Sequence, residues 1–187
     1  MHNENNFNEK INGLYSIFAF LSLLLFSCEE KLPKPTQDGK NTFGCKIDGK
    51  TWIPDGGNGF MPAKPINGGF FKVSTSDNKS YIYIRTYNKN NESVNFFIEG
   101  QTTGTYLLNE DTGFQPNQLY PKNYGYYDKN GTIYITSKKN VGKVVIDRAD
   151  KNEGIISGSF EFIVGAGTST ISITNGRFDI NMNTLNK

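Results

Sequence analysis

The chain has 187 residues, with 20 lysines and arginines against 18 aspartates and glutamates, so its formal net charge at pH 7 is only +2. This mild charge argues against nucleic acid as a partner, because nucleic-acid-binding domains are normally strongly basic. The single histidine is His2. If the N-terminal segment is removed as a signal peptide, the mature protein has no imidazole for Ser/His or Cys/His catalysis or for a mixed zinc site.

An apolar run occupies residues 14–26 and is followed by Ser27 and Cys28. The run is shorter than the roughly 20 residues that a membrane-spanning helix needs, but it has the length of the apolar region of a secretory signal. Leu25, Ser27 and Cys28 match a relaxed lipobox. We therefore expect residues 1–27 to be a lipoprotein signal peptide. Cys28 would become the acylated N-terminus, carrying palmitate or similar chains, and two or three such chains hold firmly to a membrane.

Residues 28–41 contain Pro33, Pro35 and Gly39 and show no hydrophobic period, which predicts an extended tether behind the acylated cysteine. Residues 42–187 are enough for a single domain of ordinary size. The domain would be held at the outer membrane by the lipid on Cys28, facing either the periplasm or the cell surface.

From residue 42 onward, apolar and polar residues alternate with a period of two, and no helical period persists. This pattern predicts an all-β fold, a single antiparallel β-sandwich or barrel-like domain of about eleven strands. Three turn pairs are predicted to close two-residue hairpins: Asp48-Gly49, Asn130-Gly131 and Asn175-Gly176. The residues expected on inward strand faces include Phe71, Ile82, Ile84, Val94, Phe96, Ile98, Ile133, Ile135, Val144, Ile146, Ile156, Phe160, Phe162, Ile171, Ile173, Phe178 and Ile180.

No residue is predicted to be catalytic, to bind a metal ion or to hold a cofactor. Cys45 lies on the apolar side of the alternation over residues 43–47, which predicts a buried thiol. Glu161 and Asp179 are expected on the outer faces of late strands, and the sequence does not bring any two carboxylates together as a glycosidase requires. The loop at residues 55–59 offers too few oxygen ligands for calcium.

Two segments are candidates for binding a ligand. Four tyrosines, Tyr120, Tyr124, Tyr126 and Tyr127, stand on a Gly/Pro/Asn background in an expected surface segment, where rings and hydroxyls suit a sugar or a peptide. Trp52 is expected to pair across the first hairpin near Phe43 or Cys45, and Asp55 and Asn58 follow it in a glycine-rich loop. Packing against a sheet is the alternative role for the tyrosines and for Trp52.

The stretch LPKPTQDGKNTFGCKIDGK at residues 32–50 resembles the opening of a family of small Bacteroidetes-type lipoproteins that is classed as a domain of unknown function. The segments IISGSFEF at 155–162 and ISITNGRFDI at 171–180 are similar to the ending of that family. The resemblance implies an anchored all-β domain without an assigned activity, and it assigns no catalytic residue.

These observations favour a non-enzymatic, membrane-anchored β-domain of the cell envelope that binds a ligand or partner, either a glycan or a protein. The alternatives are a structural or accessory subunit of an envelope complex and a carboxylate-based hydrolase.

Overall fold

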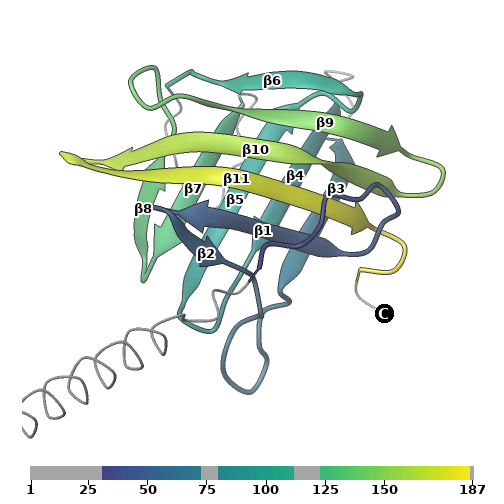
Figure 1. Ribbon diagram of the computed structural model, residues 1–187, viewed down its shortest axis with the longest axis horizontal. Coiled ribbons are helices and arrows are strands. Elements are labelled where there is room, and N and C mark those ends of the chain that lie inside the picture. The colour runs from purple at the N-terminus through teal and green to yellow at the C-terminus, as the bar shows by residue number, and fades with distance from the viewer. Residues whose placement is uncertain (1–30, 73–79, 112–122, 186–187) are drawn as a thin grey trace, which may run out of the picture. The chain divides into compact units, whose positions relative to one another are not determined.

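The computed structural model describes residues 31–72, 80–111 and 123–185, and these residues form eleven β-strands and no helix that could span a membrane. The predicted signal peptide, Cys28 and Tyr120 lie outside the described residues. The strands are β1 (Thr42–Ile47), β2 (Lys50–Trp52), β3 (Ile66–Lys72), β4 (Ser80–Thr86), β5 (Glu92–Glu99), β6 (Gly104–Leu108), β7 (Tyr124–Lys129), β8 (Thr132–Ile135), β9 (Gly142–Asp150), β10 (Ile155–Ala166) and β11 (Ser169–Asn181) (Figure 1).

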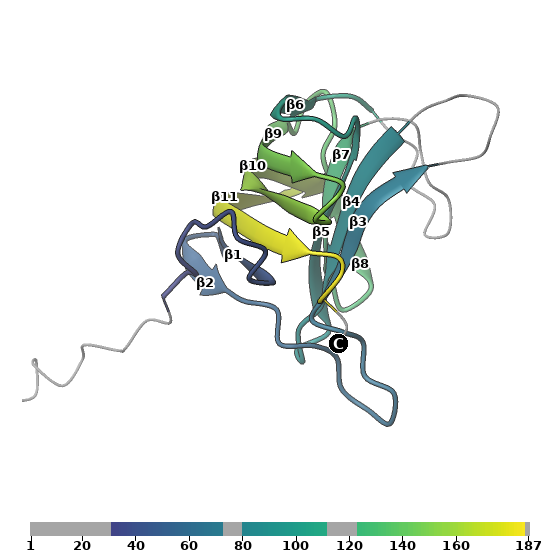
Figure 2. The ribbon, with the colours of Figure 1, turned by 90° about the vertical axis from the view of Figure 1, so that its right-hand side faces the viewer.

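The strands form one antiparallel hydrogen-bonded network that is folded into two layers. Its main path runs β2-β1-β11-β10-β8-β7-β5-β4-β3, while β9 pairs with β10 and β6 pairs with β9. Strand β10 pairs with β9 along much of its length and with β8 only at Gly165, so the network bends there. The front layer (β2, β1, β11, β10, β9, β6) crosses the back layer (β8, β7, β5, β4, β3) at a steep angle (Figures 1 and 2). The path is not closed, so the predicted all-β fold is confirmed as an open sandwich.

The main core lies between the two layers and is built from alternate strand residues. The rings of Phe160 and Phe178 pack against Phe96 of the back layer with centroid distances of 5.5 and 5.3 Å. Burying one such side chain contributes about 1.5–3 kcal/mol. Most of the predicted inward residues are found here, together with Cys45, whose thiol is fully buried and has its pKa raised by that burial.

The back layer has a second apolar cluster on its opposite face. Tyr81, Phe97 and Tyr124 are at most 4% exposed and stack in sequence, with ring centroids 4.9 and 5.5 Å apart. Phe71 and Ile135 pack against this cluster, so the prediction that they face the same side as the main core was wrong. Alternation assigns residues to one of two faces of a strand, but it does not identify the face when both are apolar.

Two of the three predicted hairpin turns are confirmed. Asp48-Gly49 and Asn130-Gly131 join β1 to β2 and β7 to β8, and all four residues have positive φ. Asn175-Gly176 instead lies inside β11, beside an irregularity in its pairing with β10. A Cβ at residue 176 would lie 2.4 Å from the Phe160 ring, so this glycine makes room for a core side chain.

Residues 33–40, named here the strap, are hydrogen-bonded to the domain. The carboxylate of Asp179 accepts bonds from Thr36 Oγ1 (2.6 Å) and from the backbone N–H groups of Asp38, Gly39 and Lys40 (3.1, 2.7 and 3.2 Å). Phe178 and Ile180 point into the main core, so Asp179 between them lies on the outer face of β11 as predicted, yet its side chain is only 1% exposed. The strap covers it, which period-two alternation does not reveal.

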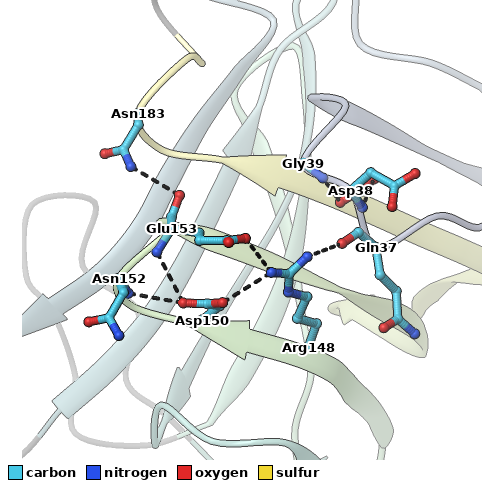
Figure 3. Close-up of polar contacts among 9 residues, drawn as sticks. Gln37, Asp38, Gly39, Arg148, Asp150, Asn152, Glu153 and Asn183 are labelled. Carbon is cyan, nitrogen blue, oxygen red and sulfur yellow. Dashed lines mark hydrogen bonds and ion pairs between the residues drawn. The ribbon is translucent and has the colours of Figure 1, made fainter.

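Two arginines hold the carbonyl groups of the strap. Arg177 donates to the Pro33 carbonyl (3.0 Å), and Arg148 donates to the Gln37 carbonyl (2.7 Å). Figure 3 shows that Arg148 also contacts Asp150 at the end of β9 and Glu153 in the β9–β10 turn. Only residues 29–32 lie between Cys28 and Pro33, the strap residue whose carbonyl group Arg177 holds.

Candidate functional site

A cleft of about 520 Å³ lies on the outer face of the front layer. Three of its residues are exposed aliphatic side chains: Leu107 of β6 (54% exposed), Val141 before β9 (46%) and Ile163 of β10 (43%). The cleft has the size of a small-molecule or side-chain pocket. The remaining residues of its lining are Asn109, Gly142, Lys143, Glu161, Phe162, Ser172, Ile173 and Thr174.

An ion pair divides this surface into an apolar and a charged half. Lys143 Nζ lies 3.0 Å from Glu161 Oε1, and both residues line the cleft as well as a second hollow of about 390 Å³. The second hollow also contains Asp147 and Arg177. Because the pair is exposed, it adds little to stability, at most about 1 kcal/mol. Its charged groups are accessible to a ligand that lies across both hollows.

The strand pattern explains how the cleft arises. Along β10, Phe160, Phe162 and Val164 point into the core, so Glu161 and Ile163 point outward. Glu161 pairs with Lys143 of β9, and Lys143 in turn pairs with Leu107 of β6, so these side chains lie side by side on one face. Ile163 is the one residue that could have indicated the cleft from the sequence, since it is an aliphatic residue in an outward position of its strand. Ile163, Leu107 and Val141 were not among the binding residues predicted from the sequence.

Two of the predicted binding residues, Asp55 and Asn58, meet at the turn between β4 and β5. The Asp55 carboxylate accepts a bond from the Lys89 backbone N–H (2.9 Å) and pairs with Lys89 Nζ (3.2 Å). The hydrogen bond from Lys89 lowers the pKa of Asp55. Asn58 Nδ2 donates to the Lys89 carbonyl. Asp55 and Asn58 therefore fasten their loop to this turn.

Trp52 and Tyr127 meet on the carboxylate of Glu92. Trp52 pairs with Cys45 as predicted, and its Nε1 donates to Glu92 Oε2 (3.0 Å). The Tyr127 hydroxyl donates to Glu92 Oε1 (2.7 Å), and Asn88 Nδ2 donates to Oε2 (2.9 Å). Partial burial raises the pKa of Glu92, but the three hydrogen bonds outweigh it and hold this pKa below its usual value. The network joins β2 of the front layer to β5 and β7 of the back layer.

The three predicted tyrosines that the structure describes, Tyr124, Tyr126 and Tyr127, do not gather on one exposed surface. The expected surface segment forms β7 from Tyr124 onward; Tyr124 belongs to the second cluster, with Tyr126 packed against it, whereas Tyr127 points into the main core. Burial raises the pKa of Tyr126 to about 12. Tyr124 is 4% and Tyr127 2% exposed, so these two rings are occupied by packing.

In the part of the chain that the structure describes, no three His, Cys, Asp or Glu side chains lie close enough to hold a metal ion together. The polar groups at the cleft are the ammonium of Lys143, the carboxylate of Glu161, the amide of Asn109 and the hydroxyls of Ser172 and Thr174. The arrangement offers contact area and hydrogen bonds to a bound molecule.

Comparison with known proteins gives a family but no activity. The model of a domain of unknown function, DUF6252, matches residues 66–180. The chain belongs to this family. The DUF6252 match contains the two closing segments, 155–162 and 171–180, on which the resemblance to a domain of unknown function was based, while the opening segment at 32–50 lies before it. No curated protein and no solved structure matches the chain.

Proposed function

We propose that this chain is a membrane-anchored lipoprotein whose β-domain binds an amphipathic protein segment in the cleft of the front layer, without catalysing a reaction. The observation that carries the proposal is the group of exposed aliphatic side chains, Leu107, Val141 and Ile163, beside the Lys143–Glu161 pair. Aliphatic residues at this exposure are suited to being covered by a partner.

The chemistry of the cleft favours a peptide over a sugar. Sugars are recognised by exposed aromatic faces, whereas the exposed apolar lining here is aliphatic. A peptide would place apolar side chains on Leu107 and Ile163 and polar groups beside Lys143 and Glu161. Each Å² of apolar surface that the peptide covers would contribute about 25 cal/mol before the costs of association.

The anchor rests on the sequence. The apolar run at 14–26 ending in Leu25, Ser27 and Cys28 supports lipid attachment at Cys28 and a place in the outer membrane, with the domain on the periplasmic or the outer side. Labelled palmitate should enter the wild-type protein and not Cys28→Ala. Equal labelling of both would contradict the anchor.

Site-specific crosslinking in the native cells tests the binding site. A photoreactive amino acid at Ile163 should give one discrete adduct, and Leu107→Asp in the same protein should reduce its yield. The matched control places the same amino acid at Thr170, an exposed residue of β11 that does not line the cleft. Equal adducts from both positions would contradict the cleft as the site. An adduct formed in fixed stoichiometry throughout purification would favour the accessory-subunit role.

A further inference from the structure

The connection between β2 and β3 carries two adjacent apolar side chains at its tip. Phe60 is fully exposed and Met61 is 87% exposed, the two largest exposures among the exposed large apolar residues. Figures 1 and 2 show this loop projecting beyond both layers at the lower edge of the domain. From Gly56 to Pro65 the only charged residue is Lys64, so no carboxylate stands at the tip.

Hydrogen bonds at the base hold the loop away from the domain surface. Gly57 N–H donates to the Ala63 carbonyl (2.9 Å), which closes the stem. Gly56 N–H donates to the Tyr87 carbonyl, and Tyr87 N–H donates to the Pro65 carbonyl (both 2.9 Å). These bonds, with the Asp55–Lys89 pair, fasten both ends of the stem to the end of β4. Phe60 and Met61 are thus presented outward by a braced stem.

The length of chain before the strap determines what Phe60 and Met61 can meet. Pro33 is held by Arg177, and four residues lie between it and Cys28, so the five steps of chain span at most about 18 Å when fully extended. The side chains of Pro33 and Ile53 both lie 2.7 Å from the position of a Cβ at Gly44, so the two side chains are neighbours. Ile53 immediately precedes the loop. The chain that leads from Pro33 back to Cys28 and the loop that follows Ile53 therefore leave the domain from adjacent points.

We propose that the loop at residues 54–65 inserts Phe60 and Met61 into the surface of the membrane that carries the lipid of Cys28, and thereby fixes the orientation of the domain. The inference rests on the proposed anchor. The short chain between Cys28 and Pro33 keeps the domain at the level of the lipid headgroups. There, the entry of apolar side chains into the acyl boundary lowers the free energy. Lys64 suits the phosphates of the headgroups, and the absence of carboxylates from the tip avoids repulsion.

The test uses the acylated protein in vesicles of phosphatidylethanolamine and phosphatidylglycerol. An environment-sensitive fluorophore is attached to Met61→Cys or, as the matched control, to Lys139→Cys, which lies in the exposed connection between β8 and β9 at the opposite edge of the domain (Figure 1). Cys45 is fully buried, and the labelling of the wild-type protein, which retains Cys45, gives the background.

A quencher carried on the lipid chains should reduce the emission at residue 61 several-fold more than at residue 139, and Phe60→Asp should lower the quenching at residue 61. Equal quenching at both positions in protein that mass spectrometry shows to be acylated would overturn the insertion and leave the anchor standing. Protein without acyl chains on Cys28 would overturn the anchor and the insertion together.

Discussion

Asp179 is the residue on which the strap depends. Its buried carboxylate accepts one hydroxyl and three backbone N–H bonds from residues 36–40. Asp179→Ala should lower the free energy of unfolding by about 3 kcal/mol, because hydrogen bonds to a charged group are lost and buried donors are left without a partner. Urea unfolding measures the effect.

The control for Asp179 is Asp147→Ala, at an exposed position of β9. It should change the free energy of unfolding by less than about 0.5 kcal/mol. Equal effects of the two substitutions would contradict the role of Asp179 in holding the strap.

Glu92 should make stability depend on pH. Its pKa is lower in the folded state than in the unfolded chain, so its charged form stabilises the fold above the unfolded pKa of about 4.3. That contribution is lost as the pH falls through the folded pKa. The melting temperature of wild type should exceed that of Glu92→Gln at pH 7, and the difference should shrink as the pH is lowered below about 4. A difference that is constant with pH would contradict this role.

At the scale of elements, β11 shows how a glycine determines the packing of its neighbour. Gly176 lies against the face of the Phe160 ring, and the nearest ring atom would be 2.4 Å from an added Cβ. Gly176→Ala should destabilise the domain by about 1–3 kcal/mol because the core is already filled. Ser169→Ala, at an exposed position of the same strand, is the control and should be nearly neutral. Thermal unfolding compares them, and an unchanged melting temperature for Gly176→Ala would contradict the steric argument.

At the scale of the whole molecule, the two layers should unfold together. Trp52 of the front layer is hydrogen-bonded to Glu92 of the back layer, and Phe96 packs between Phe160 and Phe178. Fluorescence of Trp52, the only tryptophan, and far-UV circular dichroism should therefore report the same denaturation midpoint. A Trp52 transition at distinctly lower denaturant concentration would show that the first hairpin detaches independently.

The inward residues of β4 and β5 and the first hairpin could be predicted from the sequence because they depend on local rules. Ile82, Ile84 and Phe96 obey the period of two, and Asp48-Gly49 has the backbone freedom of a tight turn. Asn175-Gly176 has the same composition, yet it lies within a strand. The role of Asn175-Gly176 depends on the contact with Phe160 of the neighbouring strand β10. The composition of the pair itself does not reveal that contact.

The candidate cleft could be predicted only in part. Ile163 stands in an outward position of its strand, and that much is visible in the sequence. Its proximity to Leu107 depends on the pairing of β9 with both β6 and β10. The meeting of Trp52 and Tyr127 on Glu92 likewise depends on which strands are neighbours.

The amino-acid sequence by itself determined the all-β class, the approximate number of strands and which residues share a face, because side-chain alternation and turn chemistry act over a few residues. Only the tertiary structure decided the strand order, the second aromatic cluster, the burial of Asp179 beneath the strap and the position of the cleft. These features arise from contacts between residues far apart in the chain, and the period of a strand carries no information about its neighbours.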